Sequence, residues 1–461
     1  MHITPKTSVA RRSFSPLLPP TAEGERNRRP MVLLHGSLVD QHGVDEYRDY
    51  ARSRGYHLDQ RTYPGIRDGA PIEESSQEAS RTINAARLQI GRENLQSLQD
   101  GTSLDDFFRL KDATGPLRQH LQDCVAEVAR LLEHSDEDLH ETLSGKLAAL
   151  QAKLETRLQG DGLANAGKVA AEVLDSLVPK AVVVGHSAGG VVAYNLAVSP
   201  EIDGSSGIGS VMLLAAPVKS GMPEPLPPGL AELPFYNWDT KVLQPWEHTP
   251  MWQLAQLNPM VRLGYPMAKA LSKTASSTAM MVTTTMTMPY TWLTRPGFAQ
   301  VMESSSFIRE LAGKPIPKDV TVLSLTTPSD KMSLTERCQL DESLPNAHNF
   351  AVDICAEPGQ LERERPTWSH VRMAQLPEQF EQQLTQSLIE HPQELRRVLD
   401  PRNDDGARCQ ALTWLGQAAE HDPEILQRRS IRQALKAVAG EQMPFSDSPA
   451  SLAQKLLDPL S

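Results

Sequence analysis

Residues 181–190 read AVVVGHSAGG, and this stretch constrains the fold more than any other part of the 461-residue chain. Four apolar residues predict a buried strand, and the apolar run VVAYNLAV that follows predicts a helix. The pattern Gly-x-Ser-x-Gly between them is typical of a nucleophile elbow, a turn so sharp that nearby side chains would collide with backbone. We therefore predict that Ser187 is a nucleophile flanked by the elbow glycines Gly185 and Gly189. The plainer alternative is a structural turn.

Strands and helices alternate on both sides of this motif. Apolar runs that predict strands lie at 31–34, 181–184, 210–217 and 321–328. A helical stretch follows the first run, and a further strand ends at Pro64-Gly65. Strands separated by helices indicate a parallel sheet with helices on both faces, so the sequence predicts an α/β fold.

Three longer stretches depart from this alternation and set the expected domain organisation. Leucines recur at helical spacing from about 70 to 160, which predicts a helical insertion. The stretch from about 218 to 315 is rich in Pro, Met, Trp and Thr and reads as a lid-like or cap-like segment. We expect a flexible tail over 1–29, an α/β domain over 30–375 and a C-terminal helical extension over 376–461.

The composition excludes several classes of protein. The formal net charge of −11, with no basic run to offset it, argues against a nucleic-acid partner. The uncharged run between Lys273 and Arg295 holds many Thr and Ser residues and a proline, so we expect no transmembrane segment. Four cysteines are too few for a disulfide scaffold. Reduced thiols are the favoured reading, and Cys338 and Cys355 would pair only in an exported protein.

The first thirty residues lack the apolar stretch of a secretory signal peptide and are rich in Ser, Thr, Pro and Arg. A disordered tail has this composition, and so does the leader of a protein exported without a cleavable signal. We therefore expect either a cytoplasmic protein or such an exported one, including a bacterial effector. The tail does not decide between them.

The motif AVVV-GHSAGG, with MVLLHGS upstream and LLAAP downstream, resembles bacterial lipases and esterases of the α/β-hydrolase superfamily. The resemblance covers about 30–66, 163–217 and 318–375. It implies an α/β-hydrolase fold whose sheet begins at Met31, the strand usually counted third, as in compact microbial lipases. It also implies a Ser-His-Asp triad, and we expect no cofactor and no metal.

An ester hydrolase of this kind needs two N–H donors for the oxyanion of its tetrahedral intermediate. The residue after the nucleophile, Ala188, supplies one donor. The second is expected from the loop after the first strand, where Leu34-His35-Gly36-Ser37 matches the His-Gly-x pattern of the family and makes the Ser37 amide the candidate. Leu38 is the alternative donor, and a plain strand-end turn is the structural one.

The acid and the base should follow the nucleophile in the order Ser, Asp or Glu, His. Asp330 follows the strand TVLSLTT and a short turn, so we predict that it is the acid; its rivals are Asp341, Asp353 and Glu357. His370 lies after a turn-rich loop and just before a helical run, where family members place their base. The rival histidines are His348, His391 and His421. We read His186, beside the nucleophile, as a packing residue.

These residues predict a serine hydrolase that cleaves carboxyl esters of a lipid type, as a lipase, esterase or phospholipase, through an acyl-enzyme. Met and aromatic residues in 218–315 suit a pliable acyl pocket and a transient membrane-surface contact, although core packing explains them equally well. A thioesterase, amidase or acyltransferase would use the same triad, and a non-catalytic binding protein on a hydrolase scaffold is the alternative outside enzymes. The sequence leaves the oligomeric state open.

Overall fold

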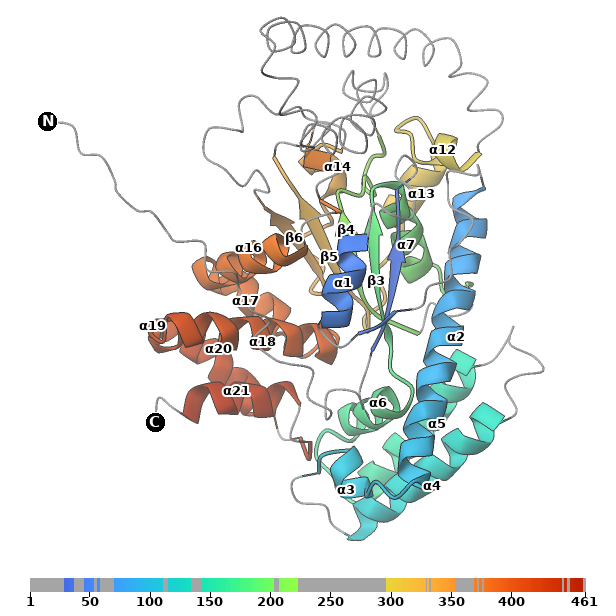
Figure 1. Cartoon of the computed structure of the whole chain (residues 1–461), viewed down its shortest axis with the longest axis vertical. Helices are drawn as coiled ribbons and strands as arrows, with labels where there is room; N and C mark the ends of the chain where they lie inside the picture. Colours follow the sequence, from blue (N-terminus) through green and yellow to red (C-terminus); the bar gives the residue numbers. More distant parts are fainter. Residues whose placement is uncertain are drawn as a thin grey trace, which may run out of the picture.

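The computed structural model describes the chain in segments, and these hold a single sheet of six parallel strands. The described residues are 29–36, 45–53, 56–58, 70–110, 115–133, 143–202, 207–222, 296–328, 330, 333–352, 369–370, 373–374, 377–441, 443–445 and 448–458. The strands are β1 (Pro30–Leu34), β2 (His57–Leu58), β3 (Ala181–His186), β4 (Ile208–Leu214), β5 (Thr321–Thr326) and β6 (Ala347–Ala351). Their order across the sheet is β2-β1-β3-β4-β5-β6 (Figure 1). This is an α/β architecture, as the alternation of strands and helices predicts.

The strand order places a topological switch between β1 and β3. The chain leaves β1 toward β2 on one side and later returns to β1 from the other side as β3. In open parallel sheets, the connections after two such strands diverge and leave a crevice outside their carboxyl ends, where ligands bind. The carboxyl ends of β1 and β3 are Leu34 and His186, so the switch lies directly before Ser187.

One face of the sheet is covered by α2 (Ile72–Gln99), α7 (Ala188–Val198) and α13 (Ser306–Gly313). All residues of α7 are buried, because this helix lies between the sheet and α2. A helix that is apolar all round needs such a position. The core on this face joins sheet residues such as Val32, Val183 and Leu213 to Ile83 and Leu196.

The other face is covered by α1 (Asp45–Ser53) and by the C-terminal helices, which are α16 (Pro377–Glu390), α17 (Pro392–Val398), α18 (Asp405–His421), α19 (Glu424–Gln427), α20 (Arg429–Ala439) and α21 (Pro449–Leu457) (Figure 1). Successive strand residues point to opposite faces. Val183 therefore joins the first core, while its neighbours Val182 and Val184 join a second core with Leu384 and Trp414. The helices expected as an extension thus form a layer of the sheet, because its second apolar face needs a cover.

A third apolar cluster lies beyond the amino edge of the sheet (Figure 1). It is built from α3 (Leu104–Phe107), α4 (Gly115–Glu133), α5 (Leu143–Gly160), α6 (Ala166–Leu177) and the second half of α2. The stretch expected as an insertion is therefore not a separate unit throughout. The start of α2 packs against the sheet and α7, and only its later residues, such as Leu88 and Leu95, enter the distal cluster.

Arg29 links the start of β1 to α18 of the C-terminal layer and to α6 of the distal cluster. Its guanidinium forms an ion pair with Asp404, the residue that caps the start of α18, at 2.8 Å. It forms a second ion pair with Asp175 of α6. All three side chains are largely buried, and charge-assisted bonds between buried groups hold their elements in a fixed relation.

Several sequence predictions lie outside the described residues. They are the tail 1–28, the oxyanion candidates Ser37 and Leu38, most of the segment 218–315, and Cys355 with its proposed pairing. Among the described cysteines, Cys124, Cys338 and Cys409 form no disulfide. No helix of the described residues combines the length and the apolar character that a membrane crossing requires.

The distal cluster should contribute to the stability of the fold. Leu121 of α4 is fully buried in this cluster. We expect Leu121→Ala to lower the free energy of unfolding by about 2–5 kcal/mol, because it leaves a cavity. Urea unfolding measures this loss. The exposed Gln119→Ala on the same helix is the control and should change stability by less than about 0.5 kcal/mol. Equal stability of the two variants would contradict the packing.

Candidate active site

Ser187 lies between β3 and α7 in a strained backbone conformation. Its φ is 54° and its ψ is −124°, values that residues other than glycine rarely adopt. Such a backbone conformation raises the free energy of the folded state by on the order of 1–3 kcal/mol, and it persists only where the surrounding structure enforces it. The Ser187 N–H donates to Leu214 O at 2.8 Å, and Ser187 O accepts from the Gly190 N–H at 3.0 Å. Neighbouring backbone therefore fixes the turn from both sides.

The glycines around Ser187 are required by close backbone contacts. A Cβ on Gly185 would lie 2.6 Å from Gly189 O, and a Cβ on Gly189 would overlap the carbonyls of Leu34 and His35. A Cβ on Gly190 would overlap Ala216. The two predicted elbow glycines thus let the first turn of α7 pass directly over the ends of β1 and β3.

The turn after β1 lies against the nucleophile. An ideal Cβ on Gly36 would be 3.0 Å from the Ser187 Cβ, so the backbone of Gly36 abuts this side chain. Ala188 is the first residue of α7, where N–H groups lack partners within the helix and the dipole favours negative charge. Of the two predicted oxyanion donors, Ala188 is therefore placed beside Ser187, whereas Ser37 lies outside the described residues.

Asp330 and His370 form a buried, hydrogen-bonded pair. Asp330 lies just beyond β5, and its Oδ2 is 2.7 Å from His370 Nδ1. Asp330 Oδ1 accepts from the Ser333 N–H at 3.1 Å, so both carboxylate oxygens are held. Both side chains are almost fully buried. Because Nδ1–H points at the carboxylate, Nε2 is the ring nitrogen that remains to act on a nucleophile.

His186 connects this pair to the elbow. Its Nε2 donates to the backbone carbonyl of His370 at 2.8 Å, and the two rings lie 4.8 Å apart between centroids. Burial is the main cause that lowers the pKa of His186 to about 3, and the nearby His370 and His35 lower it further. His186 is thus buried and packed, as expected from the sequence, and it also donates a hydrogen bond that the sequence did not predict.

The rival residues lie elsewhere. His348, expected in a loop, is the second residue of β6 and pairs with Leu323 near the amino end of the strand. Its Nε2 lies 3.4 Å from Asn403 Oδ1, and burial lowers its pKa to about 4. The other rivals fall at exposed positions or outside the described residues: His391, His421 and Asp341 are exposed, and Asp353 and Glu357 are not described.

A second strained residue lies beside the elbow. Ala215 follows β4 with a φ of 49° and is fully buried, and its N–H donates to Leu325 O at 2.9 Å. The next residue, Ala216, is the one that contacts Gly190. This conformation could not be predicted from the sequence, because alanine is not a residue that favours positive φ. The strain sets the end of β4 close to the start of α7.

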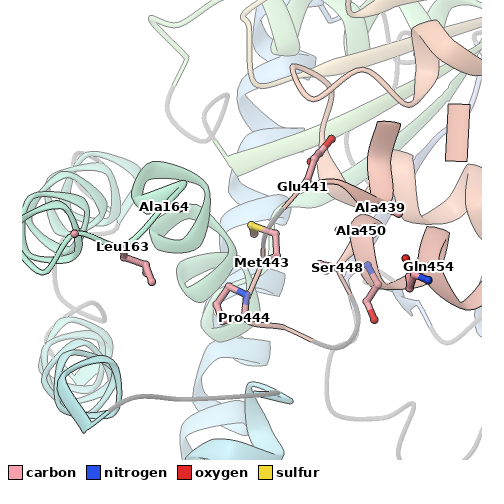
Figure 2. A pocket seen from close by; sticks show the side chains of 11 residues that line it. Leu163, Ala164, Ala439, Glu441, Met443, Pro444, Ser448, Ala450 and Gln454 are labelled. Carbon is pink, nitrogen blue, oxygen red and sulfur yellow. Dashed lines mark hydrogen bonds between the residues drawn. The ribbon is translucent and has the colours of Figure 1, made fainter. Parts of the chain in front are cut away.

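The described residues lack a cluster of side chains that could bind a metal ion. Within them, no group of three or more His, Cys, Asp or Glu side chains is arranged to hold a metal ion. A groove of about 540 Å³ lies between the turn after α5 and the segment joining α20 to α21 (Figure 2). Leu163, Met443 and Pro444 line it, and none of its lining residues belongs to the site around Ser187.

Comparisons with known proteins give no match from which a function could be inferred. No family model, no curated protein and no solved structure matches the chain. The structure brings Ser187, Ala188 and Gly36 together at one end of the sheet, and the Asp330–His370 pair is joined to them through His186. A strained serine whose neighbour His186 is bonded to a buried imidazole–carboxylate pair brings together groups that nucleophilic catalysis uses.

The elbow predicts a strong difference between two Gly→Ala substitutions. We expect Gly189→Ala to lower the free energy of unfolding by about 1–3 kcal/mol, because its methyl group overlaps two backbone carbonyls. Gly145→Ala, in α5 where a methyl group meets open space, should instead raise stability by up to about 1 kcal/mol. Denaturant unfolding of both variants measures the contrast. A Gly189→Ala protein as stable as wild type would show that the close approach at the elbow is wrong.

The burial of His348 predicts acid sensitivity. A histidine with a pKa of about 4 when folded, and about 6.5 when unfolded, binds fewer protons in the folded state. Its neutral form supports full stability above about pH 6.5, and stability falls as the pH drops toward 4. We expect His348→Gln, which keeps a donor for Asn403, to reduce the slope of unfolding free energy against pH by up to about 1.4 kcal/mol per unit. Identical slopes for variant and wild type would show that burial does not lower the pKa of His348.

Proposed function

We propose that this protein is a serine hydrolase that cleaves carboxyl esters through an acyl-enzyme, with Ser187 as nucleophile, His370 as base and Asp330 as acid. The observation that carries the proposal is the buried 2.7 Å hydrogen bond from His370 Nδ1 to Asp330. The backbone carbonyl of His370 accepts a second hydrogen bond from His186, the residue before the strained Ser187. Three chain segments far apart in sequence contribute these groups. Hydrogen-bonded imidazole–carboxylate pairs also occur as structural features of cores, but the link through His186 to a strained serine favours catalysis.

The architecture supports the α/β-hydrolase fold as part of this proposal. In that fold the nucleophile stands on a strand-to-helix turn above a mainly parallel sheet, and the acid and base follow in that order. Here β3, Ser187 and α7 form such a turn, at the switch between β1 and β3. Asp330 follows β5, and His370 follows β6, in agreement with the order of the triad.

The geometry suggests how the reaction runs. His370 Nε2 takes the proton of Ser187 Oγ while this oxygen attacks the ester carbonyl carbon. Asp330 stabilises the imidazolium, and its burial strengthens that interaction. Ala188 N–H and a donor from the turn after β1 stabilise the oxyanion. The imidazolium then protonates the departing alcohol, and water, activated by the same imidazole, releases the acid and restores Ser187.

The class of acyl donor is the open part of the proposal. Lipid-type esters are our first choice on the Met-rich and aromatic stretch between 218 and 315, which suits an acyl chain and a membrane surface. A thioesterase, amidase or acyltransferase would use the same three residues. Rates on p-nitrophenyl esters of several chain lengths, compared with acyl-CoA and amide donors, decide between these classes.

The triad should behave as one unit. We expect Ser187→Ala and His370→Ala each to lower kcat/KM by several orders of magnitude, and the double variant to lose little more. Asp330→Asn should cost less than either, because the acid orients the imidazole without taking its proton. Steady-state kinetics on p-nitrophenyl esters and labelling by a fluorophosphonate probe measure these effects.

His348→Gln is the control for the base, since it alters a buried histidine of β6 and should leave kcat/KM unchanged. Circular dichroism checks that each variant is folded. Additive losses for Ser187→Ala and His370→Ala would contradict a shared mechanism. Absence of labelling in folded wild type would instead favour a binding protein on a hydrolase scaffold.

A further inference from the structure

His186 occupies an unusual place for a buried histidine. It is 1% exposed and lies between the carbonyl of His370 and the turn at Gly36. Its Nε2 bonds to the His370 carbonyl, and its Nδ1 lies 3.2 Å from the position of an ideal Cβ on Gly36. Nδ1 has no hydrogen-bond partner among the described residues. The ring therefore spans from the base to the turn that abuts the nucleophile.

We propose that His186 is a positioning residue that holds the backbone of His370, so that the imidazole of His370 keeps its register with Asp330 and Ser187. The inference rests on the proposed function and deepens it. Its physical basis is the carbonyl of His370, which accepts a hydrogen bond from His186 and would lose this bond in a variant that lacks the donor. An unsatisfied buried carbonyl costs about 1–3 kcal/mol, and a segment relieves that cost by moving toward water.

Two side chains from other elements hold His370. Its ring Nδ1–H donates to the carboxylate of Asp330, just beyond β5, and its backbone carbonyl accepts from His186 of β3. Close to it, Met373 N–H donates to Ser369 O at 3.2 Å. Two anchors at different atoms fix the orientation of a side chain, whereas one anchor leaves it free to swing.

The electrostatic surroundings keep His186 in the state that this role needs. The titratable groups facing it are His370 and His35, and Asp330 faces His370 from β5. Burial and the two neighbouring imidazoles lower the pKa of His186 to about 3, so it stays neutral during catalysis. A neutral His186 adds no positive charge beside the imidazolium that His370 becomes. It therefore donates to the carbonyl without opposing the charge that the reaction creates.

A matched pair of amide variants tests the role. His186→Gln places an amide N–H near the position of Nε2, while His186→Asn carries the same group one methylene short. We expect His186→Asn to lower kcat by about 10- to 100-fold, because a displacement near 1 Å at a catalytic group has such an effect. KM should change by less than about twofold, since His186 is placed behind the reacting groups, and His186→Gln should stay within about threefold of wild type.

A second measurement needs no activity. In Ser187→Ala protein, the proton on His370 Nδ1 should give a low-field NMR resonance from its bond to Asp330, and Asp330→Asn assigns it by removing it. We expect His186→Asn and His186→Leu to shift or broaden this resonance, and His186→Gln to keep it. Because Ser187→Ala tests the nucleophile separately, a failed hydrolase proposal and a failed role for His186 give different results.

Two outcomes overturn the inference. Wild-type kcat and an unchanged resonance in both His186→Asn and His186→Leu would show that the ring only fills space. Equal loss of kcat in the Asn and Gln variants, with the resonance intact, would show that His186 acts by another route than holding the His370 carbonyl. If His186→Leu does not fold, the Asn and Gln pair alone gives the decision, because both keep a polar group at the site.

Discussion

The central constraint in this structure is the lack of space where the ends of β1, β3 and β4 meet the start of α7. Gly185, Gly189 and Gly190 each face backbone or a methyl group at a distance that leaves no room for a Cβ. The same contacts force Ser187 into positive φ. This crowding brings the turn at Gly36 and the first N–H groups of α7 to Ser187.

The candidate site is held mainly by the sheet, and less by loops. Leu214 and Leu325 accept hydrogen bonds that fix Ser187 and Ala215, and the buried Asp330 follows directly from β5. Rigid supports of this kind keep reacting groups within the small tolerance that catalysis requires. His370 is held by hydrogen bonds to Asp330 through its ring and to His186 through its backbone carbonyl.

Sequence reasoning reached the parts of the site that local chemistry determines. The elbow, its glycines and the strand before Asp330 are local patterns, and the pairing of Asp330 with His370 follows from chain order at one edge of the sheet. It did not predict β6, because AHNFA has a polar centre and its burial comes from the C-terminal helices. It also missed the bond from His186, since two residues 184 positions apart meet only once the sheet is assembled. Long-range packing, not propensity, decides both.

The layer formed by the C-terminal helices has a consequence for how the chain acquires its structure. One face of the sheet, with Val182, Leu323 and Phe350, is covered by α1 and by helices that follow all six strands in the sequence. Arg29 at the start of β1 meets Asp404 across 375 positions. A polypeptide emerging from the ribosome therefore leaves much of this apolar sheet surface exposed until α16–α21 are synthesised. Such non-local closure makes folding slow and leaves an aggregation-prone intermediate that chaperones recognise.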